Sequence, residues 1–266
     1  METHLAEGDI EKAFRNPKQG AVPAESKRLA APMAHGTLLW RDLYRKWVTG
    51  WLKTAERTLE AKKADDSDVW DWDQHTPVSK PDWDALVEWL TACYEAGRFD
   101  AADLVGLGQA LGTEWASEWA GNLIGMTWDE AMGKFVAQVN AWAVPDTLRD
   151  MVHDRTLYAL DEGMSFGDLK ASIMDEFVTD LSPIGGEARS LMVARTEAVR
   201  GYDMGACANY QAVGIEWIRV AHAGEPLCDE CQAWDGTEMT IEDYMAEPIL
   251  HPNCSAYPVP LPFKED

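Results

Sequence analysis

The spacing of apolar residues along this chain changes at Gly214, and that change limits the folds open to it. From Thr37 to Gly214 apolar residues recur at intervals of three and four, which places them on one face of a helix. Residues 215–220 instead alternate apolar and polar side chains, as a half-buried strand does. Asp235-Gly236 is a hairpin signal, and the proline-rich tail at 257–262 cannot be helical. The sequence therefore predicts an α+β fold that is mainly α: a helical body, then a long helix and a small β-hairpin cap.

Helix boundaries follow from capping residues and from glycine and proline. Gly97 is a predicted helix end. The predicted N-caps are Thr37, Asp82, Thr127 and Ser165. The predicted helices span residues 37–62, 82–96, 100–121, 128–142, 146–162, 165–179 and 185–212.

Composition divides the chain into three predicted parts. Residues 1–36 are rich in Ala, Pro, Gly and basic residues without a helical period. They predict a flexible arm, either a loose terminus or a segment that folds on a partner. Residues 37–145 predict a helical, tryptophan-rich domain, because ten of the thirteen tryptophans lie between Trp40 and Trp128 and favour large packing contacts. Residues 146–266 form the predicted C-terminal domain.

The formal net charge of −23 excludes some classes of function. A chain this acidic is repelled by nucleic acid and by anionic membranes, so sequence-specific nucleic-acid binding is not expected. No run of eighteen apolar residues is present, so no membrane span is expected. The odd number of cysteines, five, and the polar N-terminus argue against a secreted disulfide framework and favour synthesis in a reducing cytoplasm.

Two close pairs of metal-binding residues lie near the C-terminus. Cys228 and Cys231 form C-D-E-C, and nineteen residues later His251 and Cys254 form H-P-N-C. Thiolates and imidazole are the ligands that tetrahedral zinc prefers, and four protein ligands close a site structurally, whereas catalytic zinc keeps an open position. The spacing predicts a structural zinc site; reduced cysteines that pack a hairpin, or a Cys–Cys crosslink, are the alternatives. His222 could replace a ligand, but it is interpreted as a surface histidine.

These pairs end a longer series of motifs in the last part of the chain, from about Leu157 to Val259. In order, its pieces are L-D-E-G-M-S-F-G-D-L at 160–169, A-R-T-E-A-V-R-G-Y-D-M-G at 194–205, Trp217, the pair Cys228 and Cys231, Asp235-Gly236, and H-P-N-C at 251–254. The series resembles the phage Mu protein F-like domain of phage minor head (head morphogenesis) proteins. The chain has Cys254-Ser255-Ala256 where the family commonly has Cys-Arg-Cys.

The resemblance implies a virion protein without catalytic activity. Such a protein acts in head morphogenesis and capsid assembly, is bound near the portal, and has portal or capsid proteins as partners. It would be made in the host cytoplasm and carried in the phage head. The residues that the resemblance marks as family motifs, besides the metal ligands, are Arg195, Thr196, Glu197, Asp235 and Gly236.

The A-R-T-E motif has two interpretations. In the first, its polar residues are buried and tie the long helix to the β cap, with Glu197 paired to Arg200 at i, i+3. In the second, Arg195 and Glu197 belong to an enzyme of ADP-ribosyltransferase-like or toxin-effector type that uses the C-terminal domain. The sequence lacks the accompanying motifs of such an enzyme, which favours the first interpretation.

Overall fold

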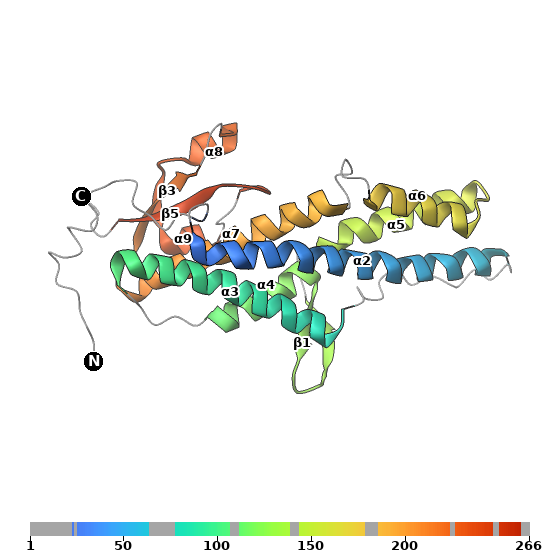
Figure 1. The fold of residues 1–266 in the computed structure, drawn as a ribbon, viewed down its shortest axis with the longest axis horizontal. Helices are drawn as coiled ribbons and strands as arrows, with labels where there is room; N and C mark the ends of the chain where they lie inside the picture. The colour runs from blue at the N-terminus through green and yellow to red at the C-terminus, as the bar shows by residue number, and fades with distance from the viewer. Residues whose placement is uncertain are drawn as a thin grey trace. The chain divides into compact units, whose positions relative to one another are not determined.

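The structure is a computed structural model that describes residues 23, 26–63, 78–106, 112–138, 144–178, 186–223, 227–246 and 250–261. These residues are mainly helical and carry a small antiparallel sheet near the C-terminus, which confirms the predicted α+β class (Figure 1). The helices are α2 (Lys27–Lys63), α3 (Lys80–Val105), α4 (Gly112–Ile124), α5 (Val144–Asp161), α6 (Phe166–Val178), α7 (Gly186–Ala212), α8 (Asp229–Trp234) and α9 (Ile241–Ala246). The strands are β1 (Met126–Asp129), β2 (Lys134–Ala137), β3 (Trp217–His222), β4 (Glu238–Thr240) and β5 (Ala256–Leu261).

The chain forms two compact units that interleave along the sequence. Of the described residues, those within 1–36, 88–116 and 194–266 form the first unit, and those within 37–87 and 117–193 form the second. This division differs from the predicted contiguous domains 37–145 and 146–266. The reason is that α2, α3, α4 and α7 each contribute residues to both units, so no change of composition marks the boundaries.

In the first unit, α3 and α7 approach closely enough that their glycines contact backbone. A Cβ atom on Gly97 of α3 would lie 1.8 Å from the carbonyl oxygen of Tyr202, and one on Gly205 of α7 would lie 1.9 Å from that of Tyr94. Gly97 therefore serves close packing inside a helix, and its prediction as a helix end is wrong. The helix instead ends before Gly106, whose φ of 91° suits glycine.

The start of α2 also belongs to the first unit. Ser26 caps the helix by accepting a hydrogen bond from the amide of Leu29 at 3.0 Å. Residues 27–36 of the predicted flexible arm are thus helical, and the predicted N-cap at Thr37 is wrong; residues 1–22 of that arm lie outside the described residues.

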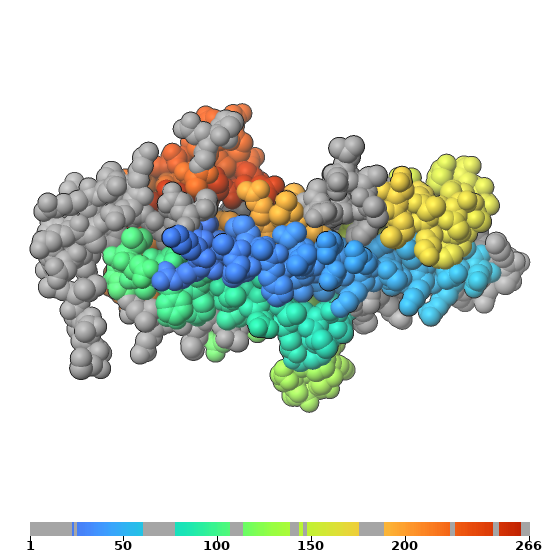
Figure 2. All heavy atoms as spheres, viewed as in Figure 1, coloured from blue at the N-terminus to red at the C-terminus, as the bar shows by residue number. Residues whose placement is uncertain are grey.

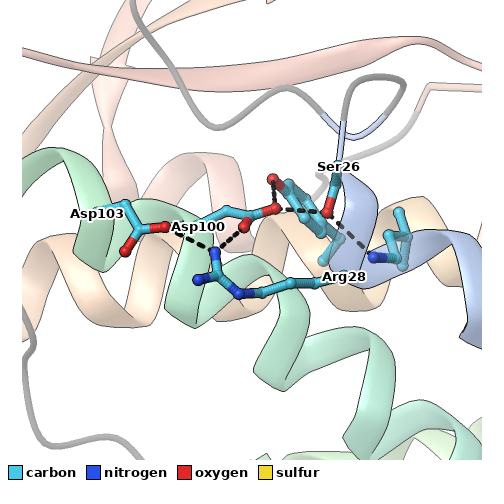
Figure 3. Close-up of polar contacts among 6 residues, drawn as sticks. Ser26, Arg28, Asp100 and Asp103 are labelled. Carbon is cyan, nitrogen blue, oxygen red and sulfur yellow. Dashed lines mark hydrogen bonds and ion pairs between the residues drawn. The ribbon is translucent and has the colours of Figure 1, made fainter.

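A polar network anchors this first turn of α2 to α3 (Figure 3). Arg28 lies between Asp100 and Asp103, with 2.7 Å from its Nη1 to Asp103 Oδ2. Asp100 also accepts hydrogen bonds from Ser26 and, at 2.8 Å, from the hydroxyl of Tyr202. Partial burial opposes ionisation of Asp100, but the bonds from Ser26, Arg28 and Tyr202 outweigh it and lower the pKa of this carboxyl.

In the second unit, aromatic residues of α2 form much of the core. Trp40, Tyr44 and Trp47 are fully buried and follow each other at intervals of four and three. Their ring centroids are 5.5–6.2 Å apart in tilted and edge-to-face pairs. Such pairs are the favoured arrangement of aromatic rings. The predicted apolar face of this helix is therefore confirmed.

The predicted helix at 128–142 is wrong in its described part. Residues 126–137 form the antiparallel hairpin β1–β2, in which Trp128 faces Phe135 with ring centroids 5.1 Å apart. The Phe135 ring also contacts Trp83, and Gly133 takes a φ of 61° in the turn. Aromatic cross-strand pairs stabilise a hairpin in a segment whose apolar spacing alone fits a helix.

The predicted helices at 146–162, 165–179 and 185–212 are confirmed as α5, α6 and α7. Ser165 caps α6 as predicted: its Oγ accepts from the amide of Asp168 at 3.2 Å and contacts the Asp168 carboxylate at 2.7 Å.

Residues after Gly214 form a small domain part, which we name the C-terminal cap. Its sheet has the order β4-β3-β5, with both pairs antiparallel. β3 matches the predicted strand, and the predicted extended tail forms β5, an edge strand of this sheet where its prolines are tolerated. The predicted Asp235-Gly236 hairpin is wrong, because residues 229–234 form α8 and β4 pairs with β3 instead.

Candidate metal centre

The four predicted ligands lie on two short segments of the C-terminal cap, one at α8 and one directly before β5, both elements labelled in Figure 1. Cys228 is the N-cap of α8, and Cys231 lies one turn into that helix. His251 and Cys254 flank a tight turn before β5, in which the amide of Cys254 donates to the carbonyl of His251 at 3.1 Å and Asn253 has a φ of 60°. Figure 2 shows the C-terminal cap as spheres coloured orange to red.

The structure brings these four side chains together. His251 Nε2 is 3.1 Å from Cys228 Sγ and 3.0 Å from Cys231 Sγ. Cys231 Sγ is 3.8 Å from Cys254 Sγ. The ligand atoms form two groups, and within each group they lie within 4.8 Å of one another. The groups are Cys228–Cys231–His251 and His222–Cys231–Cys254, and Cys231 belongs to both.

These distances fit a tetrahedral ion. With Zn–S bonds of about 2.3 Å and Zn–N bonds of about 2.0 Å, two bound sulfurs lie about 3.8 Å apart, and a sulfur and a nitrogen about 3.5 Å apart. The distance between the sulfurs of Cys231 and Cys254 matches the value for two bound sulfurs. The distances from His251 Nε2 to the sulfurs of Cys228 and Cys231 would have to lengthen by about half an ångström. The five cysteines, all among the described residues, are free thiols, so the crosslink alternative is not formed here. The Cys and His side chains therefore lie close enough to hold a metal ion.

Hydrogen bonds and burial act differently on the two cysteines of α8. The pKa of Cys228 is lowered, mainly because the Cys231 amide and thiol donate to its sulfur, with a smaller effect from His251. Burial, with the neighbouring thiols, raises the pKa of Cys231 to about 12. The pKa of His251 is raised, first by the hydrogen bond from its Nδ1 to the carbonyl of Pro252, at 2.9 Å. That bond leaves Nε2 directed at the two sulfurs.

His222, which was interpreted from the sequence as a surface residue, belongs to the cluster of metal-binding side chains. Its side chain is only 1% exposed, and its Nδ1 lies 3.1 Å from Asp235 Oδ1. The surface interpretation is therefore wrong. The turn signal Asp235-Gly236 was present in the sequence. In the structure this turn brings the chain back to β3, which ends at His222, and the Gly236 amide donates to the carbonyl of Val220 at 2.8 Å.

The A-R-T-E motif lies on α7, beside the turn that carries His251 and Cys254. Arg195 is exposed, whereas Thr196 and Glu197 are buried. Thr196 Oγ1 accepts a hydrogen bond from the amide of Asn253 at 3.0 Å, and Glu197 pairs with Arg200 at 3.3 Å. The first contact ties the long helix to the C-terminal cap, and the second lies within α7 as the i, i+3 spacing predicts.

Asp203 is a buried acid that the sequence interpretation missed. It is fully buried on α7, and its Oδ2 accepts a hydrogen bond from the hydroxyl of Tyr244 on α9 at 2.9 Å. Its other oxygen makes no hydrogen bond within the described residues. Burial raises the pKa of this carboxyl well above its usual value. In the sequence, the available signal for a buried acid was that Asp203 lies between two residues, Tyr202 and Met204, that are themselves buried.

Comparison of the chain with known protein families, with curated proteins and with solved structures finds no match. Among the helices of the described ranges, none combines the length and the apolar character that crossing a membrane requires.

Proposed function

We propose that this chain is a phage minor head protein that acts in head morphogenesis and binds portal or capsid proteins in the virion. The proposal rests on the ordered motifs of the C-terminal part. The observation that supports it best is the hydrogen bond from the Asn253 amide to Thr196, because it joins two motifs that lie more than fifty residues apart in the sequence. Motifs that meet in one place are expected of a shared domain rather than of chance similarity.

The test is a mass-spectrometric count of this chain in purified procapsids and mature particles of the phage that encodes it. Portal protein, counted in the same sample, serves as the internal reference. We expect the chain at a copy number comparable to or below that of portal protein. Its absence from both kinds of particle would overturn the proposal.

We further propose that the Cys/His cluster holds structural zinc, with Cys228, Cys231, His251 and Cys254 as ligands. The described residues of the C-terminal cap form three short strands and two helices of six residues each, so their apolar core is small. Zinc would tie α8 to the turn before β5 and contribute folding energy to the cap. Metal analysis of the purified full chain should find about one zinc per chain; a content below about a tenth of that would refute this assignment.

On this proposal the chain is not an enzyme. Glu197, the one acid of the A-R-T-E motif, is 6% exposed and paired with Arg200, which suits a structural role. The ADP-ribosyltransferase-like alternative predicts NAD hydrolysis. Incubation of the full chain with NAD should give no more nicotinamide than buffer does, and a rate above buffer that Glu197→Gln abolishes would favour the alternative.

A further inference from the structure

The last residue of β3, His222, has one ring nitrogen paired and the other buried without a partner. Its Nδ1 lies 3.1 Å from Asp235 Oδ1, and the side chain is 1% exposed. Its Nε2 is buried and makes no hydrogen bond within the part of the chain that the structure describes. Leaving a buried polar atom unpaired is unfavourable, so an atom in this position calls for a ligand.

The surroundings of the His222 ring identify the chemistry of that ligand. One ring nitrogen of His222 and the sulfurs of Cys231 and Cys254 lie within 4.8 Å of one another. The two sulfurs are 3.8 Å apart, which is the separation of about 3.8 Å expected for two thiolates on one tetrahedral zinc. A soft or borderline divalent cation such as zinc is the species that two thiolates and an imidazole select.

Asp235 holds the imidazole in the form that binds a metal. A carboxylate that accepts the Nδ1 proton fixes the tautomer in which Nε2 carries the free lone pair. Asp235 is itself fixed, because its amide donates to the carbonyl of Cys231 at 2.9 Å. The residue that orients His222 is therefore anchored to the same short helix that carries the shared cysteine.

We propose that His222 Nε2 is a ligand of the metal bound by Cys231 and Cys254, and that Asp235 is its positioning residue. The inference rests on the proposed metal site. It adds a ligand from β3, the central strand of the sheet, to a set that otherwise comes only from α8 and the turn before β5. The cluster then offers five donors, and a tetrahedral ion bound by His222 leaves one of the other four unbound.

The first test uses the full chain loaded with ¹¹³Cd²⁺ in place of zinc, with the histidines labelled with ¹⁵N. In His251→Ala we expect a ¹¹³Cd–¹⁵N coupling to one histidine Nε2, and its loss in the double variant His222→Ala/His251→Ala. A metal-loaded His251→Ala variant without any such coupling overturns the inference while leaving the metal site in place. A wild type that binds no metal overturns the metal site and this inference together.

The second test measures affinity with Co²⁺, whose visible spectrum reports its ligands, in competition with a chelator. His222→Ala should weaken binding at least tenfold and change the spectrum, and Asp235→Asn should weaken binding about 10–100-fold. His153→Ala, on α5, is the control and should leave both unchanged. Unchanged affinity and spectrum in His222→Ala would contradict the proposal.

Discussion

Replacing Gly97 with alanine tests the close contact between α3 and α7. A Cβ at this position would lie 1.8 Å from the carbonyl oxygen of Tyr202, and it would meet backbone rather than the end of a flexible side chain. A carbon and an oxygen without a covalent bond normally approach to no less than about 3.3 Å. The two helices would therefore have to separate locally by about 1.5 Å.

The free energy of that separation can be set against the gain in helix propensity. Overpacking of this kind costs typically about 1–3 kcal/mol, and a clash between two backbones belongs at the upper end. Alanine recovers about 1 kcal/mol over glycine inside a helix. The expected net effect is a loss of about 2 kcal/mol in the free energy of unfolding, or about 4–8 °C in Tm.

Gly167→Ala on α6 is the matched control, because the same substitution there meets only Ser165 Oγ at 3.5 Å, an ordinary contact. It should be neutral or stabilise the protein by up to about 1 kcal/mol. Urea unfolding followed by tryptophan fluorescence and by circular dichroism measures both variants. A Gly97→Ala variant as stable as the wild type would refute the close approach of the helices.

Three further predictions concern buried charge and the metal. Asp100→Asn should cost about 1–2 kcal/mol at pH 7, because the carboxylate accepts bonds from Arg28 and Tyr202. Since folding lowers the pKa of Asp100, its contribution exists above the unfolded value of about 4 and is lost as pH falls below it, so wild type and variant should converge at acid pH in urea titrations. Asp203→Asn should show the opposite pH dependence. Folding raises the pKa of Asp203, so the stability that its carboxyl contributes is present below the unfolded value of about 4 and is lost as pH rises. The neutral variant should therefore gain on the wild type as pH rises, and a stability difference that does not vary with pH would contradict this. Removing the metal from the full chain with a chelator should lower its Tm, measured by circular dichroism, and added zinc should restore it.

Sequence periodicity predicted the elements in which burial follows one face. The buried rings of Trp40, Tyr44 and Trp47 show why this worked for α2, and the alternation in β3 worked for the same reason. It failed where a residue acts through a contact far away in the sequence. Gly97 was predicted to end a helix, whereas its contact with Tyr202 shows that a glycine is needed there for close packing inside the helix.

The candidate site shows the same division between local and distant information. Spacing alone brought Cys228 and Cys231 onto one turn, since they are three residues apart in a short helix. The pairing of His222 with Asp235, thirteen residues away, depends on the chain reversing at Gly236, and the sequence signal for that turn was interpreted as a different hairpin. A ligand supplied by the end of a strand is therefore hard to find from spacing rules.

The contacts of the C-terminal cap explain why a metal would matter beyond its own ligands. The cap is joined to α7 through Asn253 with Thr196 and through Tyr244 with Asp203. Asn253 lies directly before Cys254, so an ion that fixes Cys254 also fixes the amide that Thr196 accepts from. Loss of the metal should loosen this first junction and leave the second, which lies on α9, in place. Hydrogen exchange that becomes faster at 250–255 but not at 241–246 after chelation would support this coupling, and equal acceleration in both segments would contradict it.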